Sequence, residues 1–129
     1  ELLTLNALCA SDGILIPVQC EYYALEGLSD LMNTLRMVKR KMNPRLEIFG
    51  VALTMFDGRT KNARDIDELL HLNYGTVVKV FGQKIPSSVR AAEITAKGVS
   101  IFQYDPHGTV GQAYDALTKE VLDNERKYS

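Results

Sequence analysis

The amino-acid sequence predicts an α/β fold in which a parallel sheet carries helices on both of its faces. Two observations lead to this prediction. Short apolar segments rich in β-branched or aromatic residues alternate with longer segments of helical periodicity, and each connection between the short segments can hold a helix. Parallel strands need such crossover connections. With 129 residues, of which 46% are hydrophobic, the chain is expected to form a single domain of ordinary globular composition.

Three apolar segments are predicted to be buried strands, because each is too short for a typical helix. They are Ile14–Val18, Ile48–Phe56 and Val77–Phe81. Apolar residues recur at three- and four-residue spacing in the helical segments. These segments are Gly27–Asn43, which Pro44 ends, Ala63–Leu72, which Asn73–Gly75 ends, and Val110–Asn124, which follows the helix-start signal Asp105-Pro106. Between the last two, we expect an irregular stretch at Ile85–Ser88, a short helix near Val89–Ala96 that Gly98 ends, and an extended segment Val99–Tyr104.

The beginning of the chain predicts that it is a fragment of a larger protein. Residues Glu1–Cys9 form an apolar helical stretch with no capping residue before it. A sheet of three parallel strands would also leave a long unpaired edge, which proteins normally pair or cover.

Composition and charge exclude several classes of function. The longest apolar runs are far shorter than the ~20 residues of a membrane-spanning helix, and no signal peptide is recognisable. The net charge of -1 means that a polyanionic partner would have to contact a local basic patch. Cys9 and Cys20 fit neither a zinc pattern nor a disulfide framework, so we expect both to be small core residues in a reducing cytosol.

The sequence contains no phosphate-binding loop, because its glycines are scattered and no Gly-Lys-Ser/Thr string occurs. His71 and His107 are isolated, and we expect surface or capping positions rather than catalysis or metal binding for them. Glu21, Glu26 and Asp57 lie near predicted strand ends, where carboxylates can act as acids and bases or can cap helices and turns. Both interpretations remain open, and no catalytic or metal-binding residue is predicted within this chain.

A long distinctive string, IPVQCEYYALEGLSDLMNTLRMV, occupies Ile16–Val38 and follows the apolar residues Leu2–Leu8. It is similar to the stretch that follows the Walker B aspartate in the ParA/Soj family of chromosome- or plasmid-partitioning ATPases, and Leu2–Leu8 matches the residues before that stretch. The resemblance continues in the family's order through LTMFDGRT, IPSSVRAAE and YDPHGTVGQAYDALTKEVL. It implies that residues 1–129 are the C-terminal half of a deviant Walker-type P-loop NTPase fold, ParA/MinD-like, without the Walker A, Walker A′ and Walker B motifs.

The resemblance also implies three groups of site residues. The loop near a nucleotide-dependent dimer interface matches Gln19, Glu21, Tyr22, Tyr23, Glu26 and Gly27. The two walls of a nucleotide-base site match Thr54, Met55, Phe56, Asp57, Ile85 and Pro86. Two residues of sequence-independent DNA binding match Arg59 and Arg90. Simpler interpretations stay open, since the tyrosines could merely pack at a helix entry and Leu53–Gly58 could be a core strand with an Asp-Gly turn.

Other basic residues could assist a DNA contact. The nearer candidates are Lys61, Arg64, Lys84 and Lys97, and the stretch Arg36–Arg45 is either a second contact or a solvated helix face. Many family members have a basic residue where Ser87 stands and a proline where Thr95 stands. The first departure would weaken DNA binding, and the second would alter only local loop geometry.

By this resemblance, the full-length parent would bind ATP and Mg²⁺, form a sandwich homodimer and bind DNA nonspecifically. A ParB/Spo0J-type partner would stimulate its ATP hydrolysis. The parent would be cytoplasmic and nucleoid-associated, with no membrane contact. The present chain, which lacks the phosphate-binding residues, is expected neither to hydrolyse ATP nor to bind nucleotide tightly. Two alternatives are a non-catalytic interaction module that uses the Tyr22-Tyr23 loop and an exposed sheet edge, and a MinD-like cell-division regulator.

Overall fold

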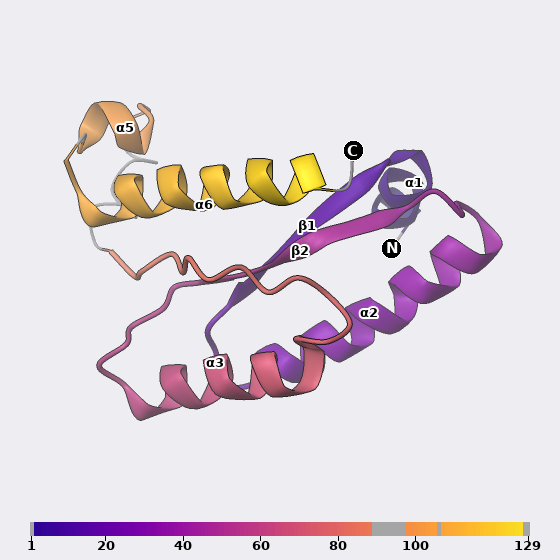
Figure 1. The fold of residues 1–129 in the computed structure, drawn as a ribbon, viewed down its shortest axis with the longest axis horizontal. Helices are drawn as coiled ribbons and strands as arrows, with labels where there is room; N and C mark the ends of the chain where they lie inside the picture. Colours follow the sequence, from indigo (N-terminus) through magenta and orange to yellow (C-terminus); the bar gives the residue numbers. More distant parts are fainter. Residues whose placement is uncertain (1, 89–97, 106, 128–129) are drawn as a thin grey trace.

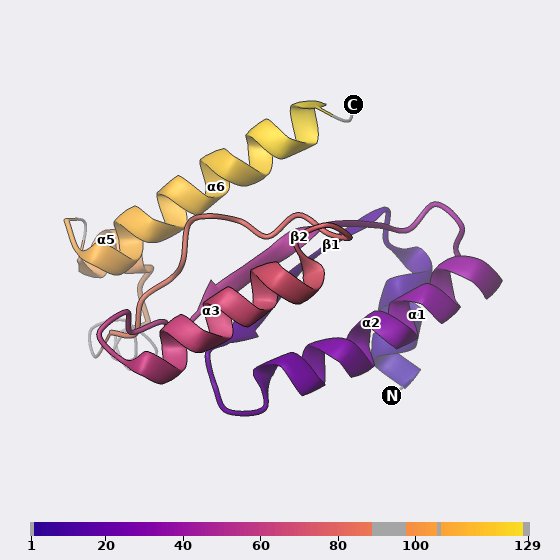
Figure 2. The same cartoon turned by 60° about the horizontal axis from the view of Figure 1, so that its bottom comes forward.

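The computed structural model describes residues 2–88, 98–105 and 107–127. Helices α2 and α3 cover one face of a parallel sheet formed by β1 and β2, and α6 covers the other face (Figures 1 and 2). Helix α1 packs beside α2, and the short α5 packs beside α6. The bounds are α1 Leu2–Ala10, β1 Gly13–Gln19, α2 Ala24–Lys41, β2 Glu47–Thr54, α3 Lys61–Tyr74, α5 Ile101–Tyr104 and α6 Thr109–Lys127. The predicted fold class is confirmed.

Strand β2 is the centre of the fold. Strand β1 pairs in parallel with one of its edges over the whole length of both strands. The other edge is hydrogen-bonded by an extended segment, residues 79–86: the Phe81 amide donates to the Val51 carbonyl at 2.9 Å, and the Ile85 amide donates to the Leu53 carbonyl at 2.9 Å. Because β2 is covered on both faces, its side chains are apolar almost without interruption, as is typical of parallel sheets.

The two faces of β2 contribute to two separate hydrophobic cores. Val51 and Leu53 belong to the core between the sheet and the α1, α2 and α3 side, together with Leu8, Ile16, Val18, Leu28, Met32, Leu35, Val38, Leu46, Ile66 and Leu70. Ala52 points the opposite way, into the core below α5 and α6, together with Phe81, Ile85, Ile101, Val110, Ala113 and Leu117. This alternation is the two-residue period of a strand.

A β-bulge interrupts the pairing of the two strands. Ile14 lies opposite Ile48, but the next residue of β1 lies opposite Gly50, so Phe49 is the extra residue. The side-chain amide of Asn124, on α6, donates to the Phe49 carbonyl at 2.9 Å and so ties α6 to the bulge. Gly50 has φ of 157°, and a Cβ at this position would overlap the ring of Phe81. The bulge therefore requires a residue without a side chain.

The third predicted strand, Val77–Phe81, is wrong as a regular strand. Within the described residues, the segment forms a single isolated bridge, Val80 with Val51, and a second bridge, Pro86 with Phe56, lies five residues beyond its end. The amides of Gly82 and Gln83 donate to the carboxylate of Glu120 on α6 and not to β2, at 3.0 and 2.7 Å. The hydrogen-bond ladder is thus broken by a side chain that lies far away in the sequence.

Other predicted boundaries shift for local reasons. Strand β2 ends at Thr54 rather than at Phe56, because Met55 adopts φ of 53°, which lies outside the extended region. Helix α3 starts at Lys61 rather than Ala63, since the Thr60 side chain caps it by accepting from the Ala63 amide. The segment predicted to be extended at Val99–Tyr104 is wrong in its second half. Ile101–Tyr104 is helical, because the Ser100 side chain caps the Gln103 amide at 3.2 Å.

Two further expectations concern burial and the segment after Ser88. Cys9 is exposed, so the prediction that it belongs to the core is wrong, and Cys20 is half-buried. The Sγ of Cys9 lies 3.5 Å from the Sδ of Met42, which follows the end of α2. The short helix expected near Val89–Ala96 lies outside the described residues. Among the helices that are described, none is long and apolar enough to cross a lipid bilayer.

Candidate functional site

The carboxyl ends of β1 and β2 lie side by side and carry most of the residues that the sequence singles out. The two strands end at Gln19 and Thr54, which are opposite each other in the register. The amide of Cys20 donates to the Thr54 carbonyl at 2.9 Å, which holds the start of the β1–α2 loop against β2. In open α/β sheets, ligands bind in the crevice beyond the carboxyl ends of the strands. This edge is therefore where a site is expected.

The β1–α2 loop presents two aromatic rings to solvent. Tyr22 and Tyr23 are 80% and 69% exposed, and their rings meet edge to face with centroids 4.7 Å apart. The loop backbone is ordered by short hydrogen bonds, since the Glu21 amide donates to Gln19 at 2.9 Å and the Ala24 amide donates to Glu21 at 3.1 Å. The two rings contact each other, and most of each side chain stays exposed to solvent.

The structure brings four of the six residues of this predicted loop to one hollow. Glu26 and Gly27 lie in the first turn of α2, which begins three residues earlier than predicted, at Ala24. Along β1 and the start of α2 lies an open hollow of about 300 Å³. Its lining includes four predicted loop residues, Gln19, Glu21, Tyr23 and Gly27.

The two segments that the sequence predicts as walls of a base site are hydrogen-bonded to each other. The Phe56 amide donates to the Ile85 carbonyl at 3.0 Å, and the Ser87 amide donates to the Phe56 carbonyl at 3.2 Å. The side chains differ in what they can contact, however. Ile85 is only 3% exposed and belongs to the core below α6, so its side chain cannot form a ligand surface. Phe56 and Pro86 remain available to line a cavity.

An open cavity of about 500 Å³ lies where these walls face α6. Phe56 and Pro86 line one part of it, and the rest of the lining is Gln83, Lys84, Thr109, Gln112, Ala113 and Ala116. The volume falls in the range of small-molecule sites, and half of the lining residues are apolar and half are polar, so a flat ring with polar edges could be accommodated. Thr54, Met55 and Asp57 do not line this cavity. The α6 residues were not predicted, because only packing of α6 on residues 79–86 places them there.

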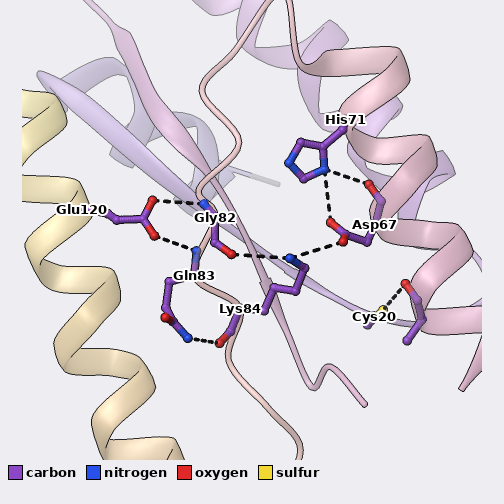
Figure 3. Close-up of polar contacts among 8 residues, drawn as sticks. Cys20, Asp67, His71, Gly82, Gln83, Lys84 and Glu120 are labelled. Atoms are coloured by element: carbon purple, nitrogen blue, oxygen red, sulfur yellow. Dashed lines mark hydrogen bonds and ion pairs between the residues drawn. The ribbon is translucent and has the colours of Figure 1, made fainter. Parts of the chain in front are cut away.

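Lys84 is the charged group at this cavity. Its Nζ lies 3.3 Å from Oδ2 of Asp67 on α3 (Figure 3). The same Nζ lies 5.4 Å from the centre of the Phe56 ring. Only a quarter of its side chain is exposed, which does not fit the expectation that Lys84 is free to assist a DNA contact. His71 is an exposed residue in the last turn of α3, and its Nδ1 lies 3.1 Å from Oδ1 of Asp67.

Arg59 is exposed but already has an anionic partner. Its Nε and Nη2 donate to the two carboxylate oxygens of Asp57, each at 2.9 Å, while 90% of its side chain remains exposed. Arg64 donates to the Gly58 carbonyl at 2.9 Å, and Lys61 pairs with Asp65 at 2.7 Å. Arg90 and Lys97 lie outside the described residues. A phosphate that binds Arg59 must therefore compete with Asp57.

The basic stretch Arg36–Arg45 lies at the opposite end of the sheet from Arg59. Helix α2 starts beyond the carboxyl end of β1 and ends just before β2 begins, so Lys39, Arg40 and Lys41 occupy its last turn. Cations in that position are stabilised by the helix dipole. This placement favours the interpretation that the basic residues form a solvated helix end, stabilised by the helix dipole. It does not favour a second DNA contact that is continuous with Arg59.

The pairing of Asp57 with Arg59 gives a testable pH dependence. Hydrogen bonds from the Arg59 side chain, then from its backbone, lower the pKa of Asp57 from its ordinary 3.8 to about 2. A lowered folded-state pKa stabilises the fold above about pH 4, and this stabilisation is lost as the pH falls through 2. An NMR titration of the Asp57 carboxyl carbon should show a midpoint near 2. In Arg59→Ala the midpoint should return toward 3.8, and an unchanged midpoint would contradict the pairing.

The groups described so far contain no evident metal centre. In the described part of the chain, no group of three or more His, Cys, Asp and Glu residues is placed to hold a metal ion.

Comparison with known proteins identifies the group to which these features belong. A family model described as an AAA domain matches residues 1–48. The chain is 45% identical to the chromosome-partitioning ATPase Soj of Thermus thermophilus over 93% of its own length and 47% of that protein. It is 47% identical to the sporulation initiation inhibitor protein Soj of Bacillus subtilis, over 95% of the chain and 48% of that protein. With the chromosome partitioning protein ParA of Caulobacter vibrioides it shares 41% identity, over 98% of the chain and 46% of that protein.

Solved structures of cobyrinic acid a,c-diamide synthase from Mycobacterium smegmatis share the fold. One superposes with a TM-score of 0.60 and 32% identity, over 68% of this chain and 35% of that one. Another, with a bound ATP analogue and magnesium, has a TM-score of 0.57 and 33% identity, over 68% of this chain and 34% of that one. The chain spans about half the length of the curated relatives that it matches. Nearly all of its own length aligns with about half the length of proteins named Soj or ParA, so the chain is homologous to part of the ParA/Soj proteins.

Proposed function

We propose that this chain is the C-terminal half of a chromosome- or plasmid-partitioning ATPase, a single α/β domain without the Walker A, Walker A′ and Walker B motifs. The observation that carries the proposal is the identity of 41–47% to Soj and ParA proteins over nearly the whole chain. The full-length protein binds ATP and Mg²⁺ between two subunits and holds DNA nonspecifically. A ParB/Spo0J-type partner stimulates its hydrolysis. Its site of action is the cytoplasm, at the nucleoid.

In this proposal the cavity below α6 receives the base of the nucleotide. Phe56 and Pro86 supply apolar surface, and Gln83 and Gln112 supply polar groups for the ring edge. The cavity lies beyond the carboxyl ends of the strands, where such sheets bind ligands. The solved relative with a bound ATP analogue and magnesium shares 33% identity with this chain, which supports a nucleotide as the ligand.

The exposed Tyr22-Tyr23 loop forms part of the surface that meets the second subunit. Exposed aromatic rings on an ordered loop are typical of protein interfaces. The loop lies next to the carboxyl ends of β1 and β2, so ATP bound there can favour the dimer by contacting both subunits. Arg59 and Arg90 provide phosphate contacts to DNA, because arginine on an exposed loop suits sequence-independent binding.

The residues that contact phosphates and Mg²⁺ belong to the other half of the protein. This chain has no Gly-Lys-Ser/Thr string, and ATP hydrolysis requires such positioning groups. We therefore expect the purified chain of residues 1–129 to show no ATP turnover above buffer, and the full-length protein to show turnover that stops when Mg²⁺ is chelated. Phosphate release measured with a coupled assay tests both. Magnesium-dependent ATP turnover by the isolated chain would contradict the proposal that the phosphate-binding and Mg²⁺-binding residues belong to the other half of the protein.

The reading frame upstream of Glu1 separates this proposal from a free-standing interaction module. A phosphate-loop pattern followed by a strand that ends in an aspartate supports the ATPase. An in-frame start codon next to Glu1 supports a module that works through the tyrosine loop alone.

A further inference from the structure

Glu120 makes the longest-range polar contact at the cavity wall. From α6, its carboxylate accepts hydrogen bonds from the backbone amides of Gly82, at 3.0 Å, and Gln83, at 2.7 Å (Figure 3). A carboxylate that accepts two backbone amides forms charge-assisted bonds, which are shorter and stronger than neutral ones. The side chain thus fixes α6 to residues 82 and 83.

The segment next to Glu120 contains more backbone than a regular strand would need. The Phe81 amide donates to the Val51 carbonyl, and the Ile85 amide donates to the Leu53 carbonyl. The two donors are four residues apart in this segment, whereas the two acceptors are only two residues apart in β2. Two residues between Phe81 and Ile85 are therefore surplus to the ladder. The surplus backbone is held by Glu120, and it carries Gln83 and Lys84, both of which line the cavity.

The opposite side of the same segment is held by α3. Nζ of Lys84 lies 3.3 Å from Oδ2 of Asp67 and 3.4 Å from the Gly82 carbonyl. Figure 3 shows the segment passing between α6, which carries Glu120, and α3, which carries Asp67. The segment is therefore tethered from both sides. Without the tether to α6, the one to α3 would remain, and the wall would move away from α6.

We propose that Glu120 is a positioning residue that sets the separation between the α6 wall and the Gln83–Pro86 wall of the cavity. This inference rests on the proposed nucleotide function, and the ligand is the planar base of the nucleotide. A flat ring between two walls gains dispersion energy only when both are at about 3.5–4.0 Å. Ala116, which lines the cavity, is one helical turn before Glu120, so both face the same side of α6. Glu120 itself does not line the cavity and acts through the segment that it holds.

The test compares a ligand with a base to one without. In the full-length protein, dissociation constants for ADP and for inorganic pyrophosphate, each with Mg²⁺, are measured by titration calorimetry. The wild type should bind ADP more tightly than pyrophosphate. Glu120→Ala should bind ADP about tenfold more weakly and keep its pyrophosphate affinity, the size expected when hydrogen bonds to a charged acceptor are removed. Glu120→Gln, which retains one acceptor oxygen, should be weakened less.

Asn124→Ala is the matched control. Asn124 also ties α6 to the sheet, through the Phe49 carbonyl at 2.9 Å, and this hydrogen bond goes to the β-bulge rather than to residues 82 and 83. Its substitution should lower stability and leave the ratio of ADP to pyrophosphate affinity unchanged. An equal fall of the ratio in Asn124→Ala would mean that general loosening of α6 causes the effect, and it would overturn the positioning role.

The other outcomes distinguish a failure of the Glu120 role from a failure of the proposed base site. If the wild type binds ADP no more tightly than pyrophosphate, the base site itself is wrong. If the wild type discriminates and both Glu120 variants keep the full ratio, the role of Glu120 is wrong while the base site stands. Should Glu120→Ala fail to fold, the ratio measured for Glu120→Gln decides in the same way.

Discussion

Gly50→Ala is expected to lower the free energy of unfolding by about 2–3 kcal/mol, the size of an overpacked core position. The added Cβ would overlap the ring of Phe81 and would lie 2.9 Å from the backbone oxygen of Lys79. Phe81 is 1% exposed and is held by the core below α6, so the ring has no free space to enter. Urea unfolding followed by far-UV circular dichroism should show a lower midpoint with an unchanged slope.

Gly27→Ala is the control for this prediction. A Cβ at Gly27 meets nothing within 4 Å, and the residue lies inside α2. Alanine there should stabilise the protein by about 0.5–1 kcal/mol, because glycine loses more backbone entropy in a helix. The two substitutions should therefore have opposite signs. Combining Gly50→Ala with Phe81→Leu should recover part of the stability, since neighbouring residues do not act additively. A neutral Gly50→Ala would show that the bulge can relax.

Charge reversal at Arg59 is expected to have the largest effect on the proposed DNA binding. In the full-length protein with ATP, Arg59→Glu should weaken binding to DNA of any sequence about equally. It should also reduce the slope of log affinity against log salt concentration by about one for each DNA phosphate that the protein no longer neutralises. Arg90→Glu should act in the same direction. Binding to two unrelated duplexes, measured by fluorescence anisotropy over a range of salt concentrations, gives both quantities.

Asp57→Asn should have the opposite effect on the same measurement. The Asp57 carboxylate occupies the Nε and Nη2 donors of Arg59, and a neutral amide would compete less with a phosphate. We therefore expect tighter DNA binding and a steeper salt dependence in this variant. Lys119→Glu, an exposed charge reversal on α6, controls for net charge. If Lys119→Glu and Arg59→Glu weaken DNA binding equally, or if Arg59→Glu leaves DNA binding unchanged, the assignment of Arg59 as a DNA contact is wrong.

Local sequence patterns were sufficient to predict structure where a helix or strand has a single apolar face to bury. The apolar spacing in α2 predicts its buried residues, Leu28, Met32, Leu35 and Val38, because a helix with one apolar stripe has a single way to pack. At the carboxyl end of β2, Phe56 and Pro86 form an isolated parallel bridge, and their role as walls of a base site stays a prediction. The residue types near the site could therefore be found from the sequence.

Long-range contacts decided the features that the sequence did not show. Residues 77–81 have the composition of a strand, but Glu120, more than thirty residues later, takes the neighbouring amides. The α6 side of the cavity depends on the same contact, so Gln112 and Ala116 could not be recognised as lining residues. Met55 ends β2 with a positive φ that its side-chain type does not favour. Each of these outcomes depends on tertiary packing, which local propensity does not report.

The central place of β2 has a consequence for how the protein loses its structure. Val51 and Leu53 pack into one core and Ala52 into the other, so adjacent residues of a single strand serve both. Neither core can come apart without removing the support of the other. Cooperative units of a protein often coincide with such shared elements. The molecule should therefore melt as one unit in spite of its two cores, with the β2 amides as the last to exchange with solvent.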